Sequence, residues 1–317
     1  MREGNASFDS SGLQFAWDST SIGYAETCLR KYQLSMIEGW RHKIPSVHLR
    51  FGGHYATALE HFHKHLANGL TKDEALIEVV WEMLKATWDY EEISPDEIDQ
   101  NPEKTQKGKP WTTDHPTKTR ENLIRTIIWY VEQFHDGAVK TIYLADGKPA
   151  VELSFSFEVH NNLVFAGHLD RVVKYQSDIY VMDQKTTVQT PSPSYFDQYS
   201  PNTQMSLYTF AGKIIYNVPI SGVIIDVAQI AVGFSRFSRG FTFRTADQLD
   251  EWYASALYHI EQARIATARD FFPMNTASCN NYGGCPFRGI CSKSPSVRDM
   301  LLSADFTRRK WDPLERR

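Results

Sequence analysis

The chain has 317 residues, of which 42% are hydrophobic and 23% are charged, and its formal net charge is −4. This balance excludes a mostly disordered chain, which would bury too little apolar surface. Only four cysteines and 18 glycines exclude disulfide-dense secreted proteins and collagen-like chains. The net charge disfavours a protein that coats nucleic acid without specificity, since such proteins are basic. Residues 292–317 nevertheless carry seven Lys and Arg against four Asp and Glu.

No targeting or membrane segment is apparent. Residues 1–10 lack the apolar core of a signal peptide, and no apolar run approaches the roughly 20 residues that a membrane helix needs. We therefore expect a cytoplasmic protein with no membrane partner. In a reducing compartment, cysteines are interpreted as metal or cluster ligands before disulfides.

The first part of the chain is predicted to be helical. The spacing of apolar residues predicts helices over 18–40, 53–68, 72–89 and 120–143. The polar, proline-containing stretch 91–119 is expected to be a long loop.

The pattern then changes to alternation with a period of two. Strands are predicted over 151–159, 163–173 and 179–185, joined by tight turns into an antiparallel meander. A helix over 201–216 follows, with Ser200 as its N-cap and Pro201 at its first position.

Two further strands, over 221–232 and 237–243, precede a last long helix to about Arg269 that Thr245 caps. The fold class expected is α/β (α+β). We expect one domain over 1–317, and its three parts are a helical part (18–143), a sheet core (150–270) and a Cys-rich segment with a basic tail (271–317).

Two carboxylates and a lysine fall at the ends of neighbouring predicted strands. Asp183 and Lys185 stand two residues apart, so both point to one face, and the hairpin can bring Asp170 beside them. Paired carboxylates suit Mg²⁺ or Mn²⁺, which polarises a phosphate and lowers the pKa of a bound water. The lysine can orient that water or stabilise charge on the phosphate. The pattern indicates phosphodiester hydrolysis.

The tripeptide Asp-x-Lys, taken alone, is more often a solvated surface pair. What favours a functional site is the assembly around it: a Gly-x-x-Asp strand before it, and a helix after it that bears Gln204 and Tyr208. These two residues are four apart and share a helix face.

At these residues the chain resembles the PD-(D/E)xK nuclease superfamily, specifically its RecB-like branch, which includes AddB-like and CRISPR-associated RecB-like exonucleases. The resemblance extends from about Cys28 to Cys291 and implies a restriction-endonuclease-like core, with a central mixed sheet flanked by helices. The matching motifs are Gly167-His168-Leu169-Asp170-Arg171, Asp183-Gln184-Lys185-Thr186 and Gln204-Met205-Ser206-Leu207-Tyr208.

The resemblance implies residue roles. Asp170 and Asp183 would be metal ligands, with the backbone carbonyl of Gln184 completing the metal shell. Lys185 would be the catalytic lysine. The residues expected to hold DNA or the geometry of the site are Gln204 and Tyr208. Glu152 matches the acidic residue of the preceding strand, and it is either a second-metal ligand or the polar side of that strand.

One departure from the family concerns a histidine ligand. The family has Phe-Gly-x-x-x-His, whereas Phe51-Gly52 here is followed by Ala56 at the histidine position. His54 is our candidate for a substitute ligand, with His61 and His65 one and two turns further on. A histidine on an amphipathic helix is more often a surface or packing residue, so the site could also lack this ligand.

The four cysteines are Cys28, Cys279, Cys285 and Cys291. Free cysteines are often small core residues, but the last three lie in a segment rich in Gly and Asn, which is untypical of a core. Four thiolates suit zinc or a [4Fe–4S] cluster, and the Cys-x2–4-Cys pairs usual for zinc are missing. The arrangement is similar to the iron–sulfur subset of the RecB-like family, which implies a structural cluster that closes the domain. Zinc is the alternative.

Some residues outside these motifs are candidates for DNA contact. Arg236 and Arg239 could contact phosphates at a hairpin turn, and a solvated turn is the alternative. Aromatic candidates for stacking on unpaired bases, each more often a core residue, are Trp111, Tyr195, Phe196 and Tyr199.

The sequence thus predicts a metal-dependent DNA nuclease, acting as an exonuclease on DNA ends or single strands. It has no Gly-x-x-x-x-Gly-Lys-Ser/Thr motif, so a helicase, recombinase or other DNA-processing subunit is an expected partner. The tail from Trp311 resembles phage versions, which implies host cytoplasm. One alternative is a catalytically degenerate DNA-binding or scaffold subunit. Another, a zinc hydrolase, is disfavoured because His-Glu-x-x-His is absent.

Overall fold

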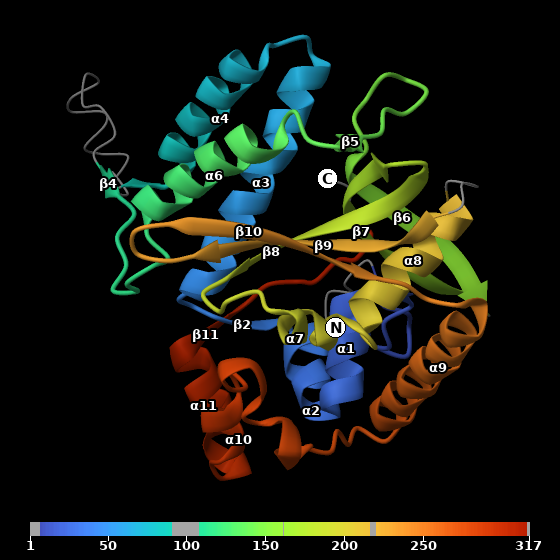
Figure 1. The fold of residues 1–317 in the computed structure, drawn as a ribbon. Helices are drawn as coiled ribbons and strands as arrows, with labels where there is room; N and C mark the ends of the chain where they lie inside the picture. The colour runs from blue at the N-terminus through green and yellow to red at the C-terminus, as the bar shows by residue number, and fades with distance from the viewer. Residues whose placement is uncertain (1–6, 91–107, 161, 216–219, 316–317) are drawn as a thin grey trace, which may run out of the picture.

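A computed structural model of the chain describes residues 7–90, 108–160, 162–215 and 220–315. At its centre is a seven-stranded mixed sheet with the order β1-β7-β8-β9-β10, in which β5 and β6 also pair with β7 (Figure 1). The strands of this sheet are β1 (Ala16–Trp17), β5 (Val139–Thr141), β6 (Val151–His160), β7 (Leu163–Tyr175), β8 (Asp178–Thr187), β9 (Ile220–Ile230) and β10 (Ser235–Thr242).

The predicted meander is confirmed: β6, β7 and β8 pair antiparallel in chain order. β9 then pairs parallel with β8, which requires a crossover, and helix α8 (Thr203–Ile215) provides it. The expected N-cap of this helix is wrong. The Ser200–Pro201 peptide is cis, the helix begins at Thr203, and Oδ1 of Asn202 accepts a hydrogen bond from the Met205 amide at 3.2 Å.

The predicted helix over 18–40 is broken into three pieces. These are α1 (Ser19–Thr27), α2 (Leu29–Tyr32) and the π-helix η1 (Gln33–Ile37). Cys28 separates the first two because its backbone is extended, with φ −168° and ψ 115°. The break matters for the cysteine prediction, since it puts Cys28 at a corner of the chain.

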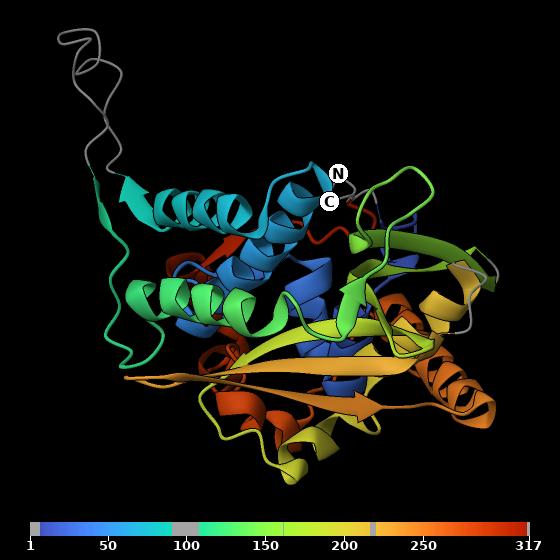
Figure 2. The ribbon, with the colours of Figure 1, turned by 45° about the horizontal axis from the view of Figure 1, so that its top comes forward.

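Three helices cover one face of the sheet (Figures 1 and 2). They are α3 (Val47–Ala67), α4 (Lys72–Ala86) and α6 (Arg120–Phe134). Helix α3 begins six residues before its predicted start, and α6 ends nine before its predicted end, because β5 takes up part of that segment. Their buried side chains, such as Leu59, Val79 and Ile127, pack with Ala228 and Ile230 of β9.

The other face packs against α1, α8 and α9 (Ala246–Ala268). Thr245 caps α9 as predicted, with its hydroxyl accepting from the Gln248 amide. Of the predicted loop 91–119, residues 91–107 lie outside the described part. β3 (Trp88–Tyr90) and β4 (Gly108–Pro110) pair on either side of it. No described helix is long and apolar enough to span a membrane.

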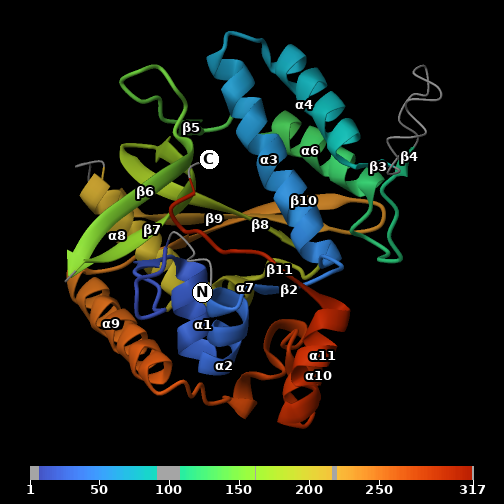
Figure 3. The same cartoon turned by 180° about the vertical axis from the view of Figure 1, so that it is seen from behind.

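The C-terminal segment, expected to be irregular, has defined elements. α10 (Arg288–Cys291) and α11 (Pro295–Asp305) precede β11 (Phe306–Arg308), which pairs antiparallel with β2 (Trp40–His42). Apolar contacts among Phe287, Leu302 and Phe306 stabilise this corner. The chain then runs back past α1 toward β7 (Figure 3).

Candidate active site

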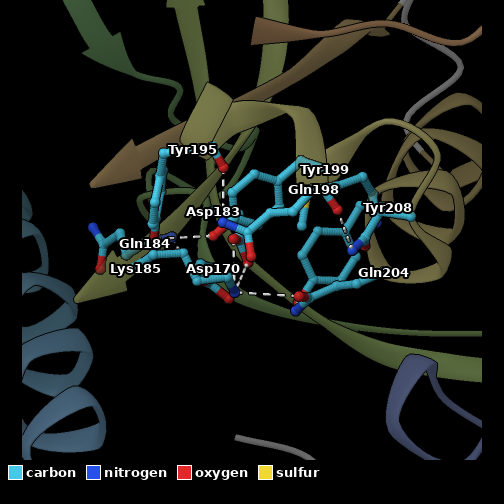
Figure 4. A network of polar contacts seen from close by, with 11 residues as sticks. Asp170, Asp183, Gln184, Lys185, Tyr195, Gln198, Tyr199, Gln204 and Tyr208 are labelled. Carbon is cyan, nitrogen blue, oxygen red and sulfur yellow. Dashed lines mark hydrogen bonds and ion pairs between the residues drawn. The ribbon is translucent and has the colours of Figure 1, made fainter. Parts of the chain in front are cut away.

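Neighbouring strands bring the predicted carboxylates together. Asp170 lies on β7 and Asp183 on β8, and the hairpin pairs Arg171 with Met182. The backbone N–H of Gln184 donates to Oδ2 of Asp170 at 3.0 Å, so the Asp170 carboxylate lies against the chain beside Asp183 (Figure 4). The structure therefore places both candidate metal ligands at one point of the sheet.

Lys185 connects these carboxylates to helix α8. Its Nζ donates to Oδ1 of Asp183 at 2.8 Å and to Oε1 of Gln204 at 3.2 Å. The Gln204 amide nitrogen in turn donates to the Tyr208 hydroxyl at 3.0 Å. Because Gln204 and Tyr208 are one turn apart on α8, the helix fixes both, and they hold the lysine in place (Figure 4).

Burial sets the electrostatics of this group. Asp183 is fully buried, and burial raises its pKa to about 7; the charge of Asp170 adds to the rise, while Lys185 opposes it. Burial acts to lower the pKa of Lys185, but the charges of Asp183 and Asp170 outweigh it, so the pKa is raised. Burial and the nearby carboxylates raise the pKa of Tyr208 well above its ordinary value, so it stays a neutral phenol.

A cleft of about 2040 Å³ opens at this site, and Asp170, Gln204 and Tyr208 line it together with Glu152. Glu152 lies on β6, opposite the Asp170 region of β7, and has the unusual φ of 45° for a non-glycine residue. Such strained backbone clusters at functional sites.

The donor set fits a divalent metal. Oδ2 of Asp183 is buried and accepts no hydrogen bond from the described residues, although Nζ of Lys185 lies 2.7 Å away. Carboxylate and carbonyl oxygens are the ligands that Mg²⁺ and Mn²⁺ prefer. In the described part of the chain, no group of three His, Cys, Asp or Glu side chains is arranged to hold a metal ion. The expected ligands at this site are two carboxylates, of Asp170 and Asp183, and the backbone carbonyl of Gln184.

The candidate histidines are not brought to the carboxylates. The His54 ring packs beside Trp111 at 6.2 Å between centroids, and burial, with the charge of Arg50, lowers its pKa. His61 and His65 instead face Glu82 of α4, at 2.7 Å and 2.9 Å. The structure thus gives His54 a packing contact, and His61 and His65 polar contacts with α4.

Four of the six expected DNA contacts outside the motifs are packed against other parts of the chain. Trp111 and Tyr199 are both buried, and a Cβ on Gly240 would lie 2.1 Å from the Phe196 ring, so these rings are packed. Arg239 does not reach into a turn, because its Nε donates to buried Asp226 at 3.0 Å. The prediction that Trp111, Phe196, Tyr199 and Arg239 are exposed contacts for DNA is therefore wrong.

Two of the candidate DNA contacts, Tyr195 and Arg236, lie near the site or at the surface. Tyr195, on α7 (Pro193–Phe196), stands near Lys185, and its hydroxyl lies 3.3 Å from that of Tyr199 (Figure 4). Arg236 of β10 lies over the Phe234 ring, with 5.6 Å to its centroid.

The four cysteines gather at one corner of the fold, and all are free. The Asn275 amide donates to Sγ of Cys28 at 3.3 Å, and Sγ of Cys279 lies 3.9 Å from the Asn275 carbonyl. The Cys285 amide donates to the Cys279 carbonyl at 2.9 Å. Burial raises the pKa of Cys291, and the charges of Cys285 and Cys28 add to this. The thiols are neighbours, though they do not form a closed ligand cage among the described residues.

One side of the cleft is formed by basic residues that the sequence motifs do not include. Arg41, Arg309 and Lys310 line the same cleft as Asp170. The excess of Lys and Arg over residues 292–317 was a signal of this, but nothing in the sequence placed that segment beside the carboxylates.

Comparison with known proteins agrees with this geometry. Sixteen chains of solved structures match the fold. One is the crystal structure of a proposed exonuclease from Eubacterium rectale, with a TM-score of 0.50, 10% identity, and coverage of 95% of this chain and 97% of that one. None of the curated proteins matches the sequence. The profile of the PD-(D/E)XK nuclease superfamily matches residues 19–292, and the chain therefore belongs to the PD-(D/E)XK nuclease superfamily.

Proposed function

We propose that the chain is a divalent-metal-dependent deoxyribonuclease that hydrolyses phosphodiester bonds, acting as an exonuclease on DNA ends or single strands. The observation that carries the proposal is the hydrogen-bonded group of Asp170, Asp183 and Lys185, whose Asp170 lines the large cleft. A purely structural ion pair would not need Gln204 and Tyr208 to orient the lysine from a separate helix.

The residues divide the work as follows. Asp170, Asp183 and the Gln184 carbonyl would hold Mg²⁺ or Mn²⁺, which when bound polarises the phosphate and lowers the pKa of a water. Lys185 donates hydrogen bonds, so it is suited to orient the attacking water or to stabilise charge on the phosphate. Gln204 and Tyr208 would hold the lysine in position through hydrogen bonds. Glu152, which lines the cleft, would either hold a second metal or form the polar side of its strand.

The cysteine corner supports a structural [4Fe–4S] cluster, with Cys28, Cys279, Cys285 and Cys291 as ligands and zinc as the alternative. An amide N–H already donates to Cys28, and hydrogen bonds of this kind tune cluster sulfurs. The cysteines lie between α1 and α2, on α10 and on the segment before it, and not on the elements that carry the carboxylates and Lys185. The cluster would therefore join the two ends of the fold without taking part in hydrolysis.

A second candidate function is a catalytically degenerate DNA-binding or scaffold subunit, with a helicase or recombinase as its partner. The contacts of His54 favour it, because they take the nearest substitute for the family histidine away from the carboxylates.

The test is degradation of end-labelled linear DNA, single- and double-stranded, by protein purified without oxygen, with Mg²⁺ or Mn²⁺ against EDTA. Lys185→Ala is compared with wild type, and Lys213→Ala, which removes an exposed lysine from the last turn of α8, serves as a control. We expect metal-dependent cleavage by wild type and the control, and none by Lys185→Ala. Folded wild type that binds DNA but cleaves neither substrate would favour the degenerate subunit.

A further inference from the structure

The C-terminal segment 306–315 forms one side of the active-site cleft. Thr307, Arg309, Lys310 and Trp311 all line it, as do Asp170 and Tyr208 from the catalytic group. The residues that match the superfamily end at 292, so this wall is added to the shared nuclease core by a part of the chain beyond it.

The segment is fixed along its length. β11 pairs with β2, and the Arg309 amide donates to the Gly39 carbonyl at 2.8 Å. This approach requires glycine, since Gly39 has a φ of +75° and a Cβ there would lie 2.8 Å from the Arg309 carbonyl oxygen. The wall is therefore built into the fold.

Further along, the segment is tied to the N-terminal part and to the catalytic strand. Nε1 of Trp311 donates to Oδ2 of Asp18 at 2.9 Å. Nε2 of His168, two residues before Asp170 on β7, lies 2.9 Å from the Glu315 carbonyl oxygen. The segment thus leads from α11 past α1 toward β7, as the red trace in Figure 3 shows.

This wall carries charges of both signs, Asp312 and Glu315 as well as Arg309 and Lys310, and two of its arginines lie close together. The Arg41 guanidinium lies over the Trp311 ring, with 5.3 Å to its centroid, and Arg309 follows directly after β11. Neither arginine makes an ion pair with a carboxylate of the described residues. Burial lowers the pKa of Arg41, and the positive charge of Arg309 adds to this while Tyr24 and Asp18 oppose it. Two cations held close together in a cleft favour a polyanion between them.

We propose that this wall binds the backbone of single-stranded DNA and leads it to Asp170 and Asp183, with Arg41 and Arg309 on its phosphates. The inference rests on the proposed function. Cations interleaved with aromatic rings are the usual surface for unpaired strands, on which bases stack while phosphates are neutralised. Here the half-buried Trp311 ring lines the cleft beside the cations.

The test measures binding without cleavage, so that its failure is distinct from failure of the nuclease proposal. A fluorescent single-stranded 20-mer is titrated in EDTA at several salt concentrations, with wild type, the double variant Arg41→Gln/Arg309→Gln, and Arg264→Gln. Arg264 is a matched control, because it lies on α9, is paired with Glu261 and does not line the cleft.

We expect the double variant to weaken binding by roughly tenfold and to reduce the slope of log K against log salt by about 1.4, at about 0.7 for each phosphate contact on a single strand. Arg264→Gln should match wild type. If the double variant has a lowered melting temperature, Arg309→Gln alone is used, since that side chain is exposed.

Three results would overturn the inference: no binding of the 20-mer by wild type at low salt, equal affinity and slope for the double variant and Arg264→Gln, or a loss of affinity that is as large for a blunt duplex as for the single strand. Binding that depends on the two arginines, without any cleavage when Mg²⁺ is added, would keep the inference and reject the nuclease.

Discussion

The Nζ atom of Lys185 lies 2.8 Å from Oδ1 and 2.7 Å from Oδ2 of Asp183, the residue two positions before it on β8. Residues two apart on a strand share a face, so the chain itself fixes this pair. The free end of the lysine is then held by Gln204, from a helix that the sequence adds only after β8. The position of the ammonium group thus depends on contacts from two elements.

Gln204→Leu should lower kcat by roughly 10- to 100-fold with little change in KM. The substitution removes the hydrogen bond that helps to hold the Lys185 ammonium group in position. Tyr208→Phe removes only the acceptor of the Gln204 amide and should cost about tenfold or less. Steady-state cleavage of a labelled oligonucleotide measures both. A rise in KM alone would contradict a positioning role and indicate that the two residues bind DNA.

Iron should copurify with the chain at about four atoms per protein when oxygen is excluded, with visible absorption that dithionite bleaches. Cys285→Ser should lose both the absorption and stability, since the cluster would join α10 to the N-terminal corner. Elemental analysis and a melting curve measure these effects. Stoichiometric zinc in place of iron would replace the cluster by a zinc site with four thiolate ligands. Absence of both metals, with an unchanged melting curve for the variant, would leave four plain thiols.

The buried pair of Asp226 and Arg239 should matter for stability. Tyr130 and Arg239 both hydrogen-bond the Asp226 carboxylate, which is buried on β9. Asp226→Asn removes the charge partner of a largely buried arginine and should cost about 3–5 kcal/mol of unfolding free energy.

The double variant Asp226→Leu/Arg239→Met should recover most of this loss, since apolar replacement of a buried ion pair is often near neutral. Urea unfolding followed by circular dichroism compares the three proteins. If the double variant is as unstable as the single one, the pair itself, rather than the unpaired charge, stabilises the sheet.

Lys118 should make stability depend on pH. Its side chain is buried, its Nζ has no hydrogen-bond partner in the described chain, and it lies over the Phe51 ring at 4.4 Å. Burial lowers its pKa to about 8. Between pH 8 and the ordinary lysine pKa near 10.4, the unfolded chain binds more protons than the folded chain. The free energy of unfolding therefore rises with pH through this window. Below pH 8 the buried lysine is charged, and its burial destabilises the folded chain to the full extent.

Lys118→Met should therefore stabilise the protein at pH 7 by about 1–3 kcal/mol, and the difference from wild type should shrink by pH 10. Melting temperatures at the two pH values measure this, with the exposed Lys43→Met as a control. A variant that is less stable than wild type at pH 7 would show that contact with Phe51 outweighs the burial of the charge.

Local pattern was sufficient where one element decides the geometry. The alternation over 151–185 predicted β6, β7 and β8, and with them the closeness of Asp170 to Asp183, because a hairpin leaves few registers. Thr245 predicted the start of α9 for the same reason: its hydroxyl bonds an amide three residues away. The sequence thus located the superfamily motifs on the right elements.

Prediction failed where distant segments compete. The helix over 18–40 breaks at Cys28, whose surroundings include Asn275 from the other end of the fold. Residues 306–308 become a strand because β2 is there to pair with them. Arg239 turns inward because Asp226 is buried on the neighbouring strand. In each case a partner far away in the chain outweighs local preference.

The sequence by itself determined the fold class, the superfamily motifs and the order of elements that bears them, because helical and strand periodicity, caps and tight turns act over a few residues. Only the tertiary structure decided that His54 faces Trp111, that Cys28 shares a corner with the three C-terminal cysteines, and that the basic segment after β11 lines the cleft of Asp170. These contacts join residues far apart in the chain, and packing of the whole chain selects them.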